Sequence, residues 1–172
     1  MPVTQLAPVL VADSITRVGP NAAGAIVVNG SHGGIYAAYV AAKLRVAAAV
    51  FNDAGVGRDQ AGIAGIDYLA GLGIPAAAVG HGTARIGYGS DMMARGVITH
   101  ANAPAATLGC RPGMACRDAA AALQQAGFAV EYLEIREPET LAALTSKATK
   151  NSRVFAAVRL GNVRLIDNMP IG

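Results

Sequence analysis

The chain has 172 residues, of which 53% are hydrophobic and 15% are charged. These values exclude a disordered chain and are sufficient for one folded domain with a buried core. Aromatic residues make up only 5% and tryptophan is absent, so the core must be filled mainly by Ala, Val, Ile and Leu. The net charge of +3 comes from basic residues that are scattered singly, which argues against nucleic-acid binding because that needs a concentrated basic face.

No apolar run approaches the roughly 20 residues that a membrane span needs, and the first residues lack the pattern of a secretory signal. The two cysteines, Cys110 and Cys116, are too far apart for a metal-binding CxxC pair. We therefore expect a cytoplasmic chain with free thiols that binds neither nucleic acid nor a membrane.

Short apolar runs alternate with polar turns and helical patterns along the first 79 residues. Strands are predicted at residues 9–12, 24–28, 46–51 and 74–79. Helices are predicted between them at residues 35–45 and 58–72, because apolar side chains recur there at helical spacing. Such alternation is typical of a parallel sheet, and uninterrupted apolar strands are buried on both faces. The expected fold class is therefore α/β, with three layers: a mostly parallel sheet and helices on both of its faces.

The pattern weakens after residue 79. Residues 80–112 are rich in glycine and predict a long loop with a short strand at 97–99, followed by a helix at 112–126 that Pro112 begins and Gly127 ends. The tail predicts a strand–helix–hairpin arrangement of the α+β type, with strands at 128–135, 154–159 and 162–166 and a short helix at 138–144. We expect one domain over residues 1–172, with a small C-terminal subdomain over 127–172 as the alternative.

The tail contains several short motifs in a fixed order. These are Tyr132-Leu133-Glu134, Pro138-Glu139-Thr140-Leu141, Arg159-Leu160-Gly161 and the stretch from Arg164 to Asn168. Over about residues 127–171 the tail resembles the C-terminal end of pantothenate synthetases, whereas residues 1–126 resemble no family that we recognise. That family uses a His-x-Gly-His nucleotide site early in its chain, and this sequence has no such motif. The resemblance therefore implies a shared subdomain for packing or dimer contact, not ATP-dependent ligase chemistry, and it transfers no catalytic residue.

Titratable side chains follow the strand-like runs. All three histidines, His32, His81 and His100, come just after such a run, and Asp13 and Asp53 occupy equivalent places. The carboxyl ends of parallel strands meet at one edge of a sheet, where ligands bind in open α/β folds. We therefore expect these side chains to converge on one site.

The expected catalytic groups are histidines and a carboxylate. His32 and His81 are predicted to act as general acid and base, because the ordinary pKa of histidine lies near neutral pH. Asp53 is predicted to orient one of them or to serve as a base itself, and the alternative is that it caps the following turn.

Two residues are candidate nucleophiles. Ser31 lies beside His32 in a glycine-rich turn, although it could instead cap the following helix. Cys110 precedes the helix expected at Pro112, and a helix N-terminus lowers the pKa of a thiol. Cys116 is expected to be plain packing inside that helix.

A further group is predicted to bind the substrate, because it lines the same turns or carries a group that suits carboxylates and phosphates. These residues are Asn29, Gly33, Gly34, Asn52, Arg85 and His100. Residues 52–62 superficially fit a glycine-rich dinucleotide loop, but the acidic residue expected about 20 residues later is absent. No cofactor is therefore expected. A metal is the alternative, since His and Asp suit zinc or iron, but no HxH, HxxxH or HxxE spacing supports it.

These observations predict a cofactor-independent hydrolase or lyase that acts on a small amide- or carboxylate-bearing metabolite. The alternative is a non-catalytic binding or regulatory domain for a nucleotide or a phosphorylated metabolite, which would use the same turns to hold an anion. The apolar tail hairpin and the small core residues also predict a homo-oligomer.

Overall fold

The computed structural model describes residues 6–124, 129–137, 140, 142, 152–160 and 163–170. The chain divides into two compact units, Met1–Ala126 and Gly127–Gly172. This division coincides with the beginning of the alternative C-terminal subdomain. The number of domains that fold independently stays a prediction.

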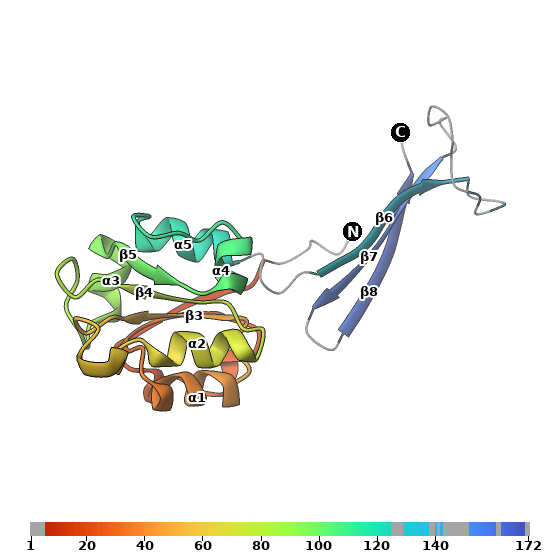
Figure 1. Cartoon of the computed structure of the whole chain (residues 1–172). Helices are drawn as coiled ribbons and strands as arrows, with labels where there is room; N and C mark the ends of the chain where they lie inside the picture. Colours follow the sequence, from red (N-terminus) through yellow and green to blue (C-terminus); the bar gives the residue numbers. More distant parts are fainter. Residues whose placement is uncertain are drawn as a thin grey trace. The chain divides into compact units, whose positions relative to one another are not determined.

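The first unit is built on a five-stranded sheet whose strands follow one another in chain order (Figure 1). The strands are β1 (Val9–Ala12), β2 (Ile26–His32), β3 (Ala48–Asn52), β4 (Ala76–Val79) and β5 (Ile98–Ala101). The first four strands are parallel, and β5 is antiparallel to β4. The polar turns after β3 and β4 therefore lie at the same edge of the sheet.

Helices cover both faces of this sheet (Figure 1). The helices on one face are α1 (Ile35–Lys43) and α2 (Ala64–Gly71), and those on the other are α3 (Gly89–Arg95), α4 (Ala103–Thr107) and α5 (Cys116–Leu123). Successive strand residues alternate between the two cores: Val27 packs with the α1 and α2 side chains, whereas Val28 packs with those of α3 and α5. The predicted α/β class and three-layer arrangement are confirmed.

Regular structure also occupies the segment that the sequence predicts to be a long loop. Residues 80–112 contain α3, β5 and α4. These elements have seven, four and five residues, too few to form stable structure alone, so tertiary packing must hold them. Met92 of α3 and Ile98 of β5 are almost completely buried in the core between the sheet and the helices α3, α4 and α5.

Two predicted helices begin later than expected. The helix predicted from residue 58 becomes a short 3-10 turn, Arg58–Gln60, in which Asp59 and Gln60 have positive φ, and α2 starts only at Ala64. The helix predicted from Pro112 starts at Cys116, because the chain first pairs Ala115 with Val97 in an isolated bridge.

The antiparallel direction of β5 is the main departure from the predicted sheet. Val79 of β4 pairs with Ile98, so β5 begins at the edge where the parallel strands end. As a result Thr99 lies beside the carboxyl end of β4, and His100 pairs with Ala78 inside the strand instead of following its end.

The second unit is an antiparallel sheet of β6 (Ala129–Arg136), β7 (Arg153–Leu160) and β8 (Val163–Pro170), paired in chain order. This confirms the strand-rich tail. The helix predicted at residues 138–144 falls largely outside the described residues. No helix in the described ranges combines the length and apolar character that a membrane crossing requires.

Candidate functional site

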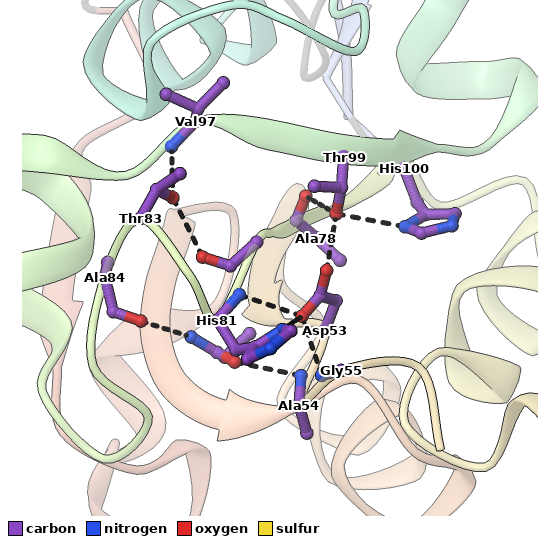
Figure 2. Close-up of polar contacts among 12 residues, drawn as sticks. Asp53, Ala54, Gly55, Ala78, His81, Thr83, Ala84, Val97, Thr99 and His100 are labelled. Atoms are coloured by element: carbon purple, nitrogen blue, oxygen red, sulfur yellow. Dashed lines mark hydrogen bonds and ion pairs between the residues drawn. The ribbon is translucent and has the colours of Figure 1, made fainter. Parts of the chain in front are cut away.

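A buried carboxylate and an exposed imidazole meet where β3 and β4 end (Figure 2). Asp53 Oδ1 accepts hydrogen bonds from the backbone N–H groups of Gly55 and His81, both at 2.9 Å, and from the ring of His81 at 3.0 Å. Asp53 Oδ2 accepts a fourth hydrogen bond from the Thr99 hydroxyl at 3.0 Å. The carboxylate is thus fixed from the turn after β3, the turn after β4, and β5.

These contacts determine the electrostatics of the carboxylate. Burial of Asp53 acts to raise its pKa, but the hydrogen bonds from Gly55, His81 and Thr99 together outweigh burial and hold the pKa below its ordinary value. Asp53 is therefore an anion at neutral pH, and it is suited to orient a histidine rather than to accept a proton.

The His81 ring takes one tautomer from this contact. An ionised carboxylate only accepts hydrogen bonds, so Nδ1 is the donor, and in the neutral ring Nε2 carries the lone pair. The side chain is 62% exposed, whereas that of Asp53 is 6% exposed. A Cβ on Gly55 would lie 3.3 Å from the His81 Cε1, so Gly55 lets the turn after β3 pass close to the ring. His81 can accept a proton from a bound molecule, and Asp53 would stabilise the resulting cation.

Thr99 connects a second histidine to the same carboxylate (Figure 2). Because Thr99 donates its single hydroxyl proton towards Asp53, its oxygen accepts from the His100 Nδ1, which lies 3.0 Å away. Sequence reasoning missed Thr99, since a parallel strand would not have brought it to this edge.

The Ser31 and His32 side chains bind different partners and not each other. The His32 Nδ1 accepts the Gly34 N–H at 3.1 Å, so a neutral ring carries its proton on Nε2 and acts as a donor. Ser31 Oγ instead accepts the Ile15 N–H at 3.0 Å and contacts Ser14 Oγ at 3.3 Å. The catalytic roles of Ser31 and His32 stay predictions, whereas the alternative role of Ser31 as a helix cap is wrong, because Gly34 occupies the N-cap of α1.

Two predicted substrate-binding asparagines are buried and bind backbone groups. Asn29 donates to the Val50 carbonyl and accepts the Ser31 N–H, and Asn52 donates to the Ala84 carbonyl and accepts the Ala54 N–H. Both side chains are fully buried. Each therefore fixes the turn that follows its strand, and its predicted contact with the substrate stays a prediction.

The glycines after β2 are also buried in packing. Gly33 and Gly34 lie against the start of α2, where a Cβ on Gly65 would be only 2.5 Å from the Gly34 carbonyl oxygen and 2.7 Å from that of Gly33. The missing side chain of Gly65 thus lets α2 approach the turn after β2 closely, and the predicted substrate contact of Gly33 and Gly34 stays a prediction.

Arg85 is paired within the protein. Its Nε lies 3.4 Å from Asp91 Oδ2, and its guanidinium lies 4.5 Å from the ring centroid of Tyr88. Asp91 also accepts from the Arg95 guanidinium at 2.6 Å. Asp91 offsets only one of these two positive charges, and the Arg85 side chain is 66% exposed, so its predicted contact with a substrate anion stays a prediction.

Cys110 does not have the expected reactive environment. Burial raises the pKa of its thiol to about 11, and burial raises that of Cys116 to about 12. The expectation of a lowered pKa is wrong because Cys110 is fully buried and the helix begins at Cys116 instead of Pro112. The packing role expected of Cys116 agrees with its place in the core.

The expected convergence is therefore partial. Asp53, His81 and, through Thr99, His100 form one connected site, whereas His32 and Ser31 bind other partners. Within the described part of the chain, no group of three His, Cys, Asp or Glu side chains is placed to hold a metal ion. The roles of the connected residues in catalysis stay predictions.

Residues 92–170 match the model of the family described as pantoate–β-alanine ligase. The C-terminal part of this chain resembles pantothenate synthetases. The match begins in α3, upstream of Gly127, so it includes Thr99 and His100 of the connected site as well as the tail.

Several individual relatives are named pantothenate synthetase. A pantothenate synthetase from a Bradyrhizobium species is 46% identical over 57 residues, covering 33% of this chain and 20% of the relative. Another from Anaplasma marginale is 53% identical over 47 residues, covering 27% and 17%. One from Caulobacter vibrioides is 35% identical over 119 residues, covering 59% and 42%. The chain thus spans less than half the length of each of these relatives.

These matches correct the functional expectation. The relatives are named as synthetases and the family as a ligase, so the predicted hydrolase or lyase is wrong. The non-catalytic alternative gains no support from the matches either.

Proposed function

We propose that this chain acts in a ligase reaction that joins a small carboxylic acid to a primary amine, with substrates of the pantoate and β-alanine type. The observation that carries the proposal is the match of residues 92–170 to the pantoate–β-alanine ligase family. The matched segment contributes Thr99 and His100 to the site, and this links the resemblance to the Asp53–His81 pair.

The Asp53–His81 pair supplies a group that amide formation needs. A primary amine is mainly an ammonium ion at neutral pH, and it attacks an acyl group only after losing a proton. The exposed His81 Nε2 is suited to take that proton, and the anionic Asp53 stabilises the imidazolium that forms.

The proposed step begins with an acid activated as a mixed carboxylic–phosphoric anhydride. The amine nitrogen attacks the acyl carbon, the new C–N bond forms, and the C–O bond to the phosphate breaks. The phosphate group leaves with the bonding electron pair. His81 Nε2 takes the proton that the ammonium loses before the attack, and the second proton, which the nitrogen loses after the C–N bond forms, goes to the solvent. The sequence lacks the His-x-Gly-His motif of the family, so no residue of this chain is assigned to the activation of the acid by ATP.

The experiment therefore supplies the activated acid directly. The full chain is mixed with synthetic pantoyl adenylate and β-alanine, and pantothenate is followed by mass spectrometry against the uncatalysed reaction. We expect faster product formation with the protein present. A second reaction with pantoate, β-alanine and ATP asks whether the chain also performs the activation. If the protein does not accelerate pantothenate formation in either reaction, the proposed function is wrong.

Two variants test the role of His81. His81→Gln should slow the amine step by about 10²–10⁴, the usual contribution of a general base. Arg95→Gln serves as the matched control, because Arg95 is an exposed residue that bonds to Asp91 instead of the pair. An unchanged rate in His81→Gln would remove this residue from the mechanism while leaving the ligase assignment open to other residues.

We also propose that the chain works in the cytoplasm as a homo-oligomer. Exposed apolar side chains on β8, Ile166 at 58% and Met169 at 51%, support association through the second unit. A monomeric mass by light scattering at micromolar concentration would overturn the oligomer.

A further inference from the structure

A groove follows the solvent side of α1 on the first unit. It has a volume of about 580 Å³ and lies between α1 and the two 3-10 turns Ile15–Arg17 and Pro20–Ala22. This volume is within the range of small-molecule sites in proteins. Neither Asp53 nor His81 lines the groove, so a molecule bound in it would leave the proposed site of amide formation free.

The wall of the groove is apolar along two turns of α1. Tyr36 is 70% exposed and Tyr39 is 49% exposed, and both line the groove beside the partly buried Val40. They share one face of the helix with Lys43, because residues three, four and seven apart lie above one another. From Tyr36 to Lys43 the helix rises by about 10 Å. Large apolar side chains that remain exposed beside a concave surface are typical of a binding site.

Two cations lie at the end of the groove where α1 ends. Lys43 is in the last turn of α1 and Arg45 follows the C-cap residue Leu44, and both are exposed and line the groove. Neither side chain has a hydrogen-bond or ion-pair partner among the described residues. None of the residues that line the groove is acidic. This end of the groove is therefore positive, and no carboxylate of its wall balances the charge.

Arg45 occupies a position at which the backbone favours glycine. Its φ of 57° is in the left-handed region, where a side chain crowds the backbone. The equivalent position of α2, directly after the C-cap residue Leu72, is Gly73, with a φ of 71°. The ends of both helices thus need this conformation, but α1 carries an arginine there at a cost in stability. Such a cost points to a role of the guanidinium outside folding.

We propose that the groove binds an aliphatic carboxylate of the medium-chain fatty acid class. The carboxylate group pairs with Lys43 and Arg45. The unbranched chain packs against Tyr39, Val40 and Val18. A positive end and an apolar wall about 10 Å long match a molecule with the same division into head group and chain.

The head group is a monoanion rather than a phosphate. The positive end of the groove coincides with the C-terminal end of α1, whose free carbonyl groups carry a partial negative charge. This charge offsets part of the attraction of the two cations. Sites for phosphate use the opposite end of a helix, where backbone N–H groups point at the ligand.

Calorimetric titration of the full chain with octanoate tests this site. Octanoate should bind at least about tenfold more tightly than butanoate, which leaves most of the apolar wall uncovered. Octylamine has the same chain and the opposite charge, so it should not bind measurably. Pantoate is short and hydroxylated and should also bind at least about tenfold more weakly than octanoate. The last comparison separates the groove from the substrates of the proposed ligase reaction.

Matched variants locate the binding. Lys43→Gln should weaken octanoate binding by about fivefold, as loss of a partly solvated ion pair does. Arg111→Gln removes the same charge from an exposed residue outside the groove and should leave binding unchanged. Tyr39→Ala should weaken binding at least about fivefold, because it removes apolar surface. Tyr68→Ala changes a tyrosine of α2 that does not line the groove, and it should bind octanoate as the unmodified chain does.

Arg45→Gly separates binding from stability. It should weaken octanoate binding by about fivefold. It should also raise the Tm by a few degrees, because glycine adopts the positive φ without strain. A residue that serves only the fold would give the opposite result, with a lower Tm and unchanged binding.

Several results would overturn the proposal. These are no measurable binding of octanoate, equal affinities for octanoate and butanoate, unchanged binding in Lys43→Gln and Arg45→Gly, or a lower Tm in Arg45→Gly. Binding of the chain to phosphatidylglycerol vesicles without binding of octanoate would also overturn it and would indicate a lipid surface instead. None of these measurements depends on the conversion of pantoyl adenylate, so the groove and the proposed function can fail separately.

Discussion

A single oxygen of Asp53, Oδ1, accepts hydrogen bonds from both the backbone N–H and the ring Nδ1 of His81, at 2.9 and 3.0 Å. The backbone contact fixes the turn after β4 and the ring contact fixes the tautomer. Asp53 therefore links the stability of the sheet edge to the chemistry available at His81, and its protonation should affect both.

The free energy of unfolding should depend on pH through Asp53. Its pKa in the folded chain lies below the value of about 3.9 expected in the unfolded chain, so the ionised carboxylate stabilises the fold above that value. This stabilisation should disappear as the pH falls through the folded pKa. The difference in unfolding free energy between the unmodified chain and Asp53→Asn should be largest near neutral pH and shrink below about pH 4.

Urea unfolding at a series of pH values measures this difference. Asp118→Asn, which changes an exposed carboxylate on α5, is the control and should leave the profile nearly unchanged. A difference for Asp53→Asn that stays constant from neutral pH to about pH 2 would show that the charge of Asp53 does not stabilise the fold.

The Thr99 hydroxyl should stabilise the fold through its bond to the same carboxylate. Thr99→Val keeps the shape of the side chain but removes the donor to Asp53 Oδ2, at a cost of about 1.5 kcal/mol, the lower end for a bond to a charged group, because Thr99 is exposed to solvent. The pKa of Asp53 should also rise, because one of the contacts that lower it is lost. Chemical denaturation and NMR titration of the Asp53 carboxyl carbon measure the two effects.

A second threonine provides the comparison. The Thr107 hydroxyl donates to the Ala103 carbonyl within α4 and is exposed. Thr107→Val should change the stability by less than about 1 kcal/mol and leave the Asp53 titration unaltered. Equal losses of stability in Thr99→Val and Thr107→Val would show that the Thr99–Asp53 hydrogen bond stabilises the fold no more than the hydrogen bond of Thr107 does.

The sequence predicts the sheet edge well because strand ends and polar turns are local features. The apolar runs before Asp53 and His81 identify two neighbouring parallel strands, and parallel neighbours bring their carboxyl ends together. Thr99 could not be found in this way. Its position depends on the reversal of the chain between β4 and β5, which is fixed by the buried contacts of the short helix α3 and not by a pattern within β5.

Burial is the other property that residue type did not reveal. Asn29 and Cys110 have the chemistry of site residues, but both are fully buried, and Asn29 is used by neighbouring backbone groups. A short polar side chain after a strand can face a ligand or fix its own turn, and only the packing around it distinguishes the two.

Both thiols should be unreactive in the folded chain. Burial raises the pKa of Cys110 to about 11 and that of Cys116 to about 12, so almost no thiolate is present at neutral pH. A thiol reagent such as Ellman's reagent should react with neither cysteine in buffer and with both in urea. Rapid reaction of one thiol in buffer would contradict the buried position of that cysteine, and the modified residue can be identified by mass spectrometry.

Two glycines of α2 should respond in opposite ways to an added methyl group. A Cβ on Gly65 would lie 2.6 Å from the Ala38 Cβ and within 2.7 Å of two backbone carbonyl oxygens, those of Gly33 and Gly34. Backbone atoms cannot move aside cheaply, so Gly65→Ala should destabilise the chain by about 1–3 kcal/mol. A Cβ on Gly71 would meet nothing within 4 Å, and Gly71→Ala should stabilise the helix by up to about 1 kcal/mol.

Thermal and urea denaturation of the two variants test this close approach of α1 and α2. Because Gly34 also donates its N–H to His32, displacement of α1 in Gly65→Ala should disturb the turn after β2 as well. If the two substitutions change the stability in the same direction and by the same amount, the Gly65 contact with the turn after β2 does not limit the approach of the helices.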